Sequence, residues 1–329
     1  MDHVNLGHSG LKVSRACLGA MNFGTSDDAP CDEAEARRTI DAFLDTGANF
    51  IDTANVYTGG QSEEIVGRAI ADKRDRVVLA TKGRMPMGRG PNDSGLSRGH
   101  LTKALDDSLR RLGTDYVDLY QVHAWDPDTP IEETMAALDG FVRSGKVRYI
   151  GCSNFTGSQI VEAQWAANRQ NGTPFTSLQP RYSLISRDIE ADVLPAAQRH
   201  GLGTMIYSPL GGGFLTGKYE PEKEPEADTR LGRRGGRWGA MTLTDRNFAI
   251  VDEVKKVAAE LDTTPIAVSL AWVLSRRGVT SLIIGPRSQA QMESNLPGFD
   301  LALPAEVVSR LNDASRPGGE SMPSGARRR

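Results

Sequence analysis

The sequence predicts an α/β protein built as a closed (β/α)8 barrel, in which eight parallel strands are each followed by a helix. Short apolar runs alternate with amphipathic stretches along the chain, as expected when helices connect parallel strands. Eight such units favour a closed barrel over an open sheet. The length of 329 residues suits a barrel of about 250 residues enlarged by insertions.

The expected elements follow one another in a regular order. Residues 4–13 hold two alternating runs around a Gly/Ser turn, which predicts an N-terminal β-hairpin. The strands expected after it are 17–20, 49–53, 77–82, 117–123, 149–153, 177–179, 204–208 and 281–285. The expected helices are 32–45, 62–71, 98–112, 131–142, 156–169, 189–199, 245–261, 265–276 and 288–296.

Two long Gly-rich segments, 83–99 and 211–244, come directly after expected strands. Long loops in compact domains commonly act as lids or binding loops, and here they would hang over the carboxyl ends of the strands. No internal repeat or linker divides the chain. We therefore expect one barrel domain over residues 1–316 and a flexible tail over 317–329.

The composition argues against several classes of protein. Charged residues make up 25% and hydrophobic residues 39%, and a net charge of −3 gives no indication of a nucleic-acid or membrane partner. Three cysteines without CxxC spacing disfavour disulfides and a metal site. No signal peptide or run of about 18 apolar residues is found. We expect a cytoplasmic protein that binds a small molecule and no metal.

Four residues near the ends of expected strands predict a proton-transfer site. Asp52, Lys82 and His123 each end an apolar run, and Tyr57 follows Asp52 by one loop. Parallel strands in a barrel end on one face, so these side chains should meet there. A phenol can protonate a carbonyl oxygen, although its pKa near ~10 is high for work near pH ~7. An ammonium ~4 Å away contributes roughly 4 kcal/mol toward lowering it.

In this scheme Asp52 keeps Lys82 charged, and His123 either orients the carbonyl oxygen or shares the proton. The alternative is that Asp52 and Lys82 form an ordinary ion pair and Tyr57 is a surface residue. Four such groups at neighbouring strand ends favour the catalytic interpretation.

Two further segments indicate phosphate binding. Residues 212–218 nearly match GxxxxGK[S/T], but Tyr219 replaces the magnesium-binding hydroxyl, which disfavours an NTPase and favours a phosphate-contacting loop. Residues 285–288 follow the last strand and open a helix, a recurrent phosphate site in such barrels, and the guanidinium of Arg287 suits a phosphate. The simpler interpretation is that Ser288 only caps the helix. No GxGxxG follows a strand, so a Rossmann site is not indicated.

On these residues the chain resembles the aldo-keto reductases, from the hairpin to about Ala314. Residues 47–54 with Tyr57 resemble the family's most specific signature, and residues 151–155 resemble its second. Residues 207–210 and 285–295 resemble its cofactor segments.

The resemblance implies reversible, NADPH-dependent reduction of an aldehyde or ketone, with NADH a weaker cofactor and no Rossmann fold. Asp52, Tyr57, Lys82 and His123 fall on the catalytic tetrad, with Tyr57 as proton donor. The positions that correspond to cofactor contacts are Ser153, Asn154 and Gln179 (carboxamide), Tyr207 (nicotinamide stacking), Ser208, Leu210, Gly212 and Lys218 (pyrophosphate), and Gly285, Arg287, Gln291 and Asn295 (2′-phosphate and adenine).

Some positions separate alternatives within the family. Ser294 stands where relatives often carry an acid next to the asparagine. A retained His123 distinguishes the chain from steroid double-bond reductases and some channel-associated relatives. The alternative function is a redox-sensing, NADPH-binding regulatory subunit with slow turnover.

The substrate pocket is expected to be apolar and partly aromatic, although such residues are equally ordinary in a core. Its expected members are Met21, Phe23, Met85 and Trp125.

Overall fold

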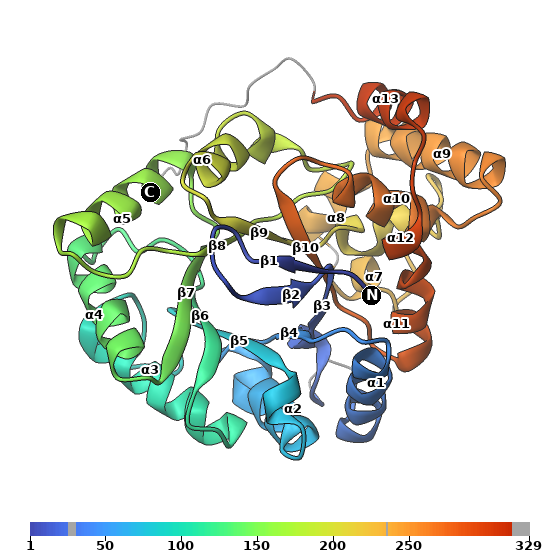
Figure 1. Cartoon of the computed structure of the whole chain (residues 1–329). Coiled ribbons are helices and arrows are strands. Elements are labelled where there is room, and N and C mark those ends of the chain that lie inside the picture. Colours follow the sequence, from blue (N-terminus) through green and yellow to red (C-terminus); the bar gives the residue numbers. More distant parts are fainter. Residues whose placement is uncertain (26–30, 235, 318–329) are drawn as a thin grey trace.

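The computed structural model describes residues 1–25, 31–234 and 236–317, which form a closed barrel of eight parallel strands (Figure 1). The order around the barrel is β10-β3-β4-β5-β6-β7-β8-β9, so the predicted (β/α)8 architecture is confirmed. The strands are β3 (Ala16–Gly19), β4 (Phe50–Asp52), β5 (Val78–Gly83), β6 (Val117–Val122), β7 (Val147–Ser153), β8 (Ser177–Gln179), β9 (Gly203–Tyr207) and β10 (Val279–Ile284).

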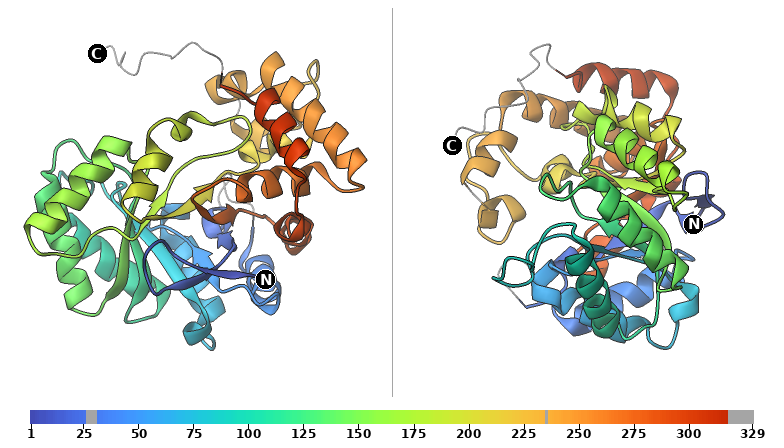
Figure 2. Two further views of the ribbon diagram at one scale, coloured as in Figure 1. Left: turned by 45° about the horizontal axis from the view of Figure 1, so that its top comes forward. Right: turned by 90° about the vertical axis from the view of Figure 1, so that its left-hand side faces the viewer.

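A β-hairpin, β1 (His3–Asn5) and β2 (Lys12–Ser14), closes the amino end of the barrel. Leu6, in its turn, is fully buried among the inward-facing apolar side chains, and the backbone N–H of His8 donates to Gly201 O at 2.8 Å. Gly7 has φ 59°, and a Cβ there would come within 2.3 Å of Gly201 O, so only glycine fits. Figure 2 shows the hairpin, in blue, and the insertion after β9, in yellow to orange, on opposite ends.

The outer ring is made of helices, and in several of them a side chain caps the first turn. Asp32, Ser97, Thr156, Thr264 and Ser288 each accept a hydrogen bond from a backbone N–H three residues later. The helices are α1 (Glu33–Asp45), α2 (Gln61–Ile70), α3 (Arg98–Leu112), α4 (Ile131–Arg143), α5 (Gly157–Arg169), α6 (Val193–Arg199), α7 (Arg230–Arg234), α8 (Gly236–Thr242), α9 (Asp245–Glu260), α10 (Pro265–Leu274), α11 (Gln289–Asn295), α12 (Pro297–Asp300) and α13 (Ala305–Ala314).

Three expectations need correction. The single helix expected over 189–199 is split into a 3-10 turn, η4 (Asp188–Glu190), and α6, because the Asp192 carboxylate between them accepts the N–H of Gly157 at 2.8 Å. The segment 211–244 is not a plain loop, since it contains the 3-10 segment η5 (Gly211–Thr216), α7 and α8. Helix α13 was not anticipated; Arg310 joins it to α9 through Glu253 and Glu260.

The expected single domain over residues 1–316 stays a prediction, and the tail expected from 317 lies outside the described residues after Pro317. Within the described ranges, no single helix is long and apolar enough to cross a membrane. Helices α9 and α10 reach that length and hydropathy only together, across a 100° bend. The same ranges contain no group of His, Cys, Asp and Glu side chains that could hold a metal ion.

Candidate active site

The four predicted catalytic residues meet in one cluster at the carboxyl end of the barrel. Asp52 ends β4, Lys82 lies in β5, His123 follows β6, and Tyr57 opens the 3-10 segment η2 (Tyr57–Gly60). The Lys82 Nζ donates to Asp52 Oδ2 at 2.5 Å, to the Thr53 carbonyl at 2.9 Å and to Tyr57 Oη at 3.3 Å. The Tyr57 and His123 rings pack edge to face, with centroids 5.7 Å apart.

Burial sets the protonation states of this cluster. Burial raises the pKa of Tyr57 and outweighs the opposing charge of Lys82. Desolvation of the phenolate thus opposes the lowering of this pKa that was expected from the lysine. Burial alone would lower the pKa of Lys82, but Asp52 and Tyr57 raise it above the ordinary value. At neutral pH the cluster therefore contains a protonated phenol beside a charged lysine.

His123 is uncharged at neutral pH. Burial, followed by the charges of Lys82 and Arg84, lowers its pKa to about 3. A neutral imidazole can donate a hydrogen bond to a carbonyl oxygen, but it carries no spare proton. Of the two roles considered for His123, this favours orientation of the oxygen.

Two glutamine side chains complete the environment of Asp52. Its Oδ1 accepts from Gln121 Nε2 at 3.0 Å and from Gln179 Nε2 at 2.9 Å, while Gln179 Nε2 also donates to Gln121 Oε1 at 3.3 Å. Sequence reasoning missed Gln121. The available signal was a polar residue two positions after the inward-facing Leu119 and two positions before His123.

A cavity of about 600 Å³ opens above this cluster. Asp52, Tyr57 and His123 line it, whereas Lys82 is fully buried and bonded to the first two. Every position predicted to contact the cofactor also lines it: Ser153, Asn154, Gln179, Tyr207, Ser208, Leu210, Gly212, Lys218, Gly285, Arg287, Gln291 and Asn295.

Hydrogen bonds fix the part of the lining nearest the cluster. Asn154 donates from Nδ2 to the His123 carbonyl at 3.0 Å, and its Oδ1 accepts from Tyr207 Oη at 2.9 Å. Asn154 has φ 57° and Ser208 has φ 52°, a left-handed conformation that side-chain-bearing residues rarely adopt. Such strained positions concentrate at functional sites.

The four residues expected in the substrate pocket lie in different places relative to this cavity. Met21 lines the cavity, but Phe23 is fully buried in the core and cannot line it. Met85 and Trp125 are not among the lining residues, and Trp125 packs edge to face on Phe155 at 5.3 Å. Methionine and aromatic residues serve cores and pockets alike, so composition did not separate the two uses.

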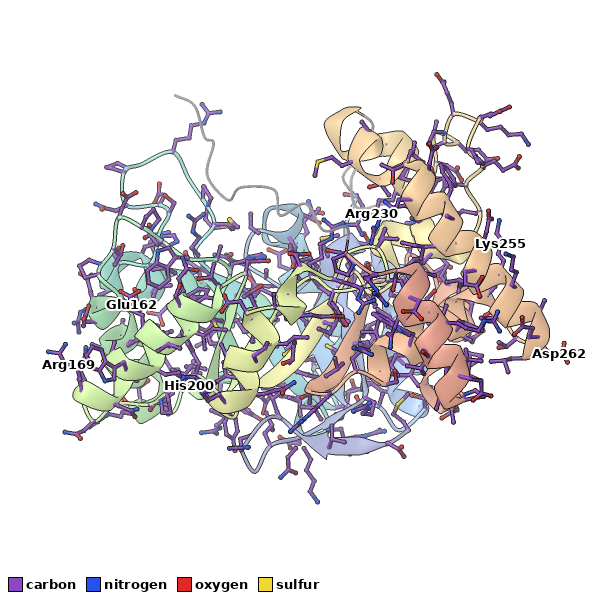
Figure 3. All side chains as sticks on the ribbon, turned by 90° about the horizontal axis from the view of Figure 1, so that it is seen from above. Glu162, Arg169, His200, Arg230, Lys255 and Asp262 are labelled. Carbon is purple, nitrogen blue, oxygen red and sulfur yellow. The ribbon has the colours of Figure 1, made fainter. Side chains whose placement is uncertain are left out.

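Four lysine and arginine side chains of the described residues line the cavity. Lys218 and Arg287 were predicted there, and Arg230 and Arg233 of α7 also line it. Arg287 Nη1 donates to the Asp228 carbonyl at 2.8 Å, which ties the segment before α7 to the loop after β10. Figure 3 has the hairpin at the bottom and Arg230 on the opposite, loop-bearing side.

These residues fit an extended dinucleotide phosphate. The cationic side chains suit its phosphates. Asn295 Oδ1 is buried without a hydrogen-bond partner, and an amine such as that of adenine would supply the missing donor.

The chain belongs to the aldo-keto reductase family, since the sequence model described as "Aldo/keto reductase family" matches residues 15–316. It is 40% identical to "Uncharacterized oxidoreductase YrpG" of Bacillus subtilis, over 98% of each chain. It is 38% identical to "Probable voltage-gated potassium channel subunit beta" of Oryza sativa subsp. japonica, over 94% of this chain and 95% of that one. It is also 32% identical to "Norsolorinic acid reductase" of Aspergillus flavus, over 93% of this chain and 79% of that one. The suspected family is thus confirmed, and the protein is an NAD(P)H-dependent oxidoreductase.

Proposed function

We propose that the protein reduces an aldehyde or ketone to an alcohol with NADPH and also catalyses the reverse oxidation. The observation that carries the proposal is the 3.3 Å contact between Lys82 Nζ and Tyr57 Oη beneath the cavity. A proton donor with a buried cation beside it is what protonation of a carbonyl oxygen requires.

A bound nicotinamide would supply the hydride to the carbonyl carbon. Tyr57 donates its proton to the carbonyl oxygen, and the phenolate left behind is stabilised by Lys82. At about 4 Å and an effective dielectric of about 20, that attraction is worth roughly 4 kcal/mol. Neutral His123 holds the oxygen by a hydrogen bond. Asp52 balances the charge of Lys82, so the lysine stays protonated although it is buried away from water.

The cofactor contacts proposed for the next residues rest on the family to which the chain belongs. Ser153, Asn154 and Gln179 hold the carboxamide, and Tyr207 stacks on the nicotinamide ring. Lys218 and Arg287 face the phosphates. Arg287 precedes the N-terminus of α11, where backbone amides also favour an anion, so it supports a preference for NADPH over NADH.

The test is Tyr57→Phe, which keeps the ring and removes the donor. Turnover of an aldehyde panel, followed by loss of NADPH absorbance, should fall about 10²–10⁴-fold, the usual contribution of a general acid. NADPH binding, followed by fluorescence, should be retained. Tyr116→Phe, at a ring packed under Arg74 and Arg148 outside the site, is the matched control. A Tyr57→Phe enzyme with more than half of wild-type activity would refute the assignment.

A second candidate is an NADPH-binding regulatory subunit with slow turnover. The 38% identity to a relative named as a potassium channel subunit supports it. His123 in place beside Tyr57 favours the enzyme instead. Many turnovers per protein molecule would support the enzyme, whereas a single stoichiometric oxidation of bound NADPH would support the subunit.

A further inference from the structure

One fully buried polar side chain, Gln121, has no part in the reaction proposed above. It lies on β6, where its backbone pairs with Lys82 of β5 and Gly151 of β7. Gly151 has no side chain, and a Cβ built there would lie 3.4 Å from Gln121 Cγ and 2.3 Å from Ser177 Oγ. The glycine therefore leaves space for Gln121 to reach Gln179 of β8 across β7.

The hydrogen bonds of the three side chains determine how both amides are turned. The Asp52 carboxylate accepts only, so Gln121 and Gln179 must each present an NH2 group to its Oδ1, at 3.0 and 2.9 Å. Gln179 also turns its Nε2 toward Gln121, and the Gln121 oxygen is the acceptor there, at 3.3 Å. Both hydrogens of the Gln179 amide are thus committed to protein partners.

This leaves the Gln179 side-chain oxygen for the cavity that Gln179 lines. The Gln179 oxygen can accept a hydrogen bond from the NH2 group of a carboxamide in the cavity. If the Gln179 amide were reversed, its own NH2 group would face that NH2 group, and no hydrogen bond could form. Without Gln121, the second hydrogen of Gln179 would lose its partner and the amide would be held by one bond only.

We propose that Gln121 is a positioning residue that locks the Gln179 amide with its oxygen toward the cavity, and thereby orients the nicotinamide carboxamide. The inference rests on the proposed function, because it takes NADPH as the occupant of the cavity. Gln121 touches neither cofactor nor substrate in this scheme and acts through Gln179.

The test compares two ligands that differ only in the nicotinamide. Gln121→Met keeps the length of the side chain and removes the amide. NADPH binding, measured by calorimetry, should weaken about five- to tenfold, the usual worth of one hydrogen bond. Binding of 2′-phospho-ADP-ribose, which lacks the nicotinamide, should change less than about twofold. Equal losses for both ligands, or no loss for either, would overturn the proposal.

Gln164→Met is the matched control. Gln164 is also buried, and its amide bonds the backbone of Phe175 at 2.8 and 3.0 Å, but it lies on α5 outside the barrel. It should leave both affinities unchanged. An effect equal to that of Gln121→Met would assign the loss to general destabilisation.

A double-mutant cycle tests whether Gln121 acts through Gln179. In a Gln179→Met background, Gln121→Met should weaken NADPH binding no further; an additive loss would contradict the proposed route. If Gln121→Met does not fold, Gln121→Asn keeps an amide too short to bridge Asp52 and Gln179 and should show the same selective loss. If the wild-type protein binds neither ligand, the proposed function is overturned together with this inference. If the wild type binds NADPH and Gln121→Met binds it equally well, this inference alone is overturned.

Discussion

The interior of the barrel has two layers of opposite chemistry. The lower layer, closed by the hairpin, is apolar and holds Leu6, Val13, Cys17, Phe50, Val78, Ala80, Leu119 and Met205. The upper layer, beneath the cavity, holds Asp52, Lys82, Gln121 and Gln179, all buried. On three strands the change takes two residues, from Phe50 to Asp52, from Ala80 to Lys82 and from Leu119 to Gln121.

The difference shows what each layer can contribute. Apolar side chains gain free energy wherever water is excluded, so the lower layer needs only shape and volume. A buried ion pair seldom gains stability over an apolar replacement, because desolvation offsets the attraction. The upper layer is tolerated because Lys82 and Asp52 are hydrogen-bonded on every side, and it is useful because burial sets its protonation states.

The largest effect is expected from Lys82→Met, which leaves Asp52 buried without its cation. Removing one partner of a buried pair costs about 3–5 kcal/mol in the free energy of unfolding. Turnover should fall and the apparent pKa of the catalytic acid should rise, since the cation that favours the phenolate is lost. Urea unfolding and pH–rate profiles measure both.

Lys73→Met is the matched control for Lys82→Met. Lys73 pairs with Asp41 at the same 2.5 Å, but the Asp41 side chain is 41% exposed. Such a pair is worth about 0–1 kcal/mol, so activity and stability should hardly change. If Lys82→Met behaved like this control, the upper layer would be an ordinary ion pair.

In the lower layer, Leu119→Ala should cost stability and leave the cofactor site unchanged. Deleting a buried leucine side chain typically lowers the free energy of unfolding by about 2–5 kcal/mol. The affinity for NADPH and the shape of the pH–rate profile should match those of wild type, because Leu119 points below the polar layer. A shifted pH profile would show that the two layers are not independent.

Arg287→Ala tests the exposed end of the cavity, where water screens charge more than in the barrel. A charge-assisted contact contributes roughly 1.5–3 kcal/mol, so NADPH binding should weaken about ten- to a hundredfold. NADH binding should be almost unchanged, and the NADPH preference of wild type should shrink at high salt. Fluorescence titrations of both cofactors decide this. Equal losses would mean that Arg287 only supports the loop through Asp228.

The last test concerns His123 and the stability of the protein in acid. An unfolded imidazole takes up a proton near its ordinary pKa of 6.5, while folded His123 stays neutral down to about 3. The unfolded state therefore binds more protons in this window, so stability is full above 6.5 and falls as the pH drops toward 3. His123→Asn should reduce the slope of unfolding free energy against pH. Identical slopes for wild type and His123→Asn would contradict the burial argument.

Much of this arrangement could be predicted because it depends on local pattern. Asp52, Lys82 and His123 follow apolar strand runs, and parallel strands bring their carboxyl ends together whatever the loops do. Asp32, Thr156 and Ser288 mark helix starts in the sequence, because each side chain caps a backbone N–H only three residues later. The place of Arg287 at the cavity was also predictable, since this residue lies between β10 and the start of α11.

What the sequence determined by itself was therefore the order of strands and helices, the face on which the polar residues gather and the family. The tertiary structure alone decided that Phe23 lies in the core, that Arg230 and Arg233 fold back onto the cavity and that Gln121 joins Asp52 to Gln179. It also decided that Tyr57 keeps a raised pKa beside a lysine. The physical reason is the same in each case. Desolvation and hydrogen bonding of a side chain depend on all the residues around it, and most of these are distant in the chain, so no local sequence pattern contains this information.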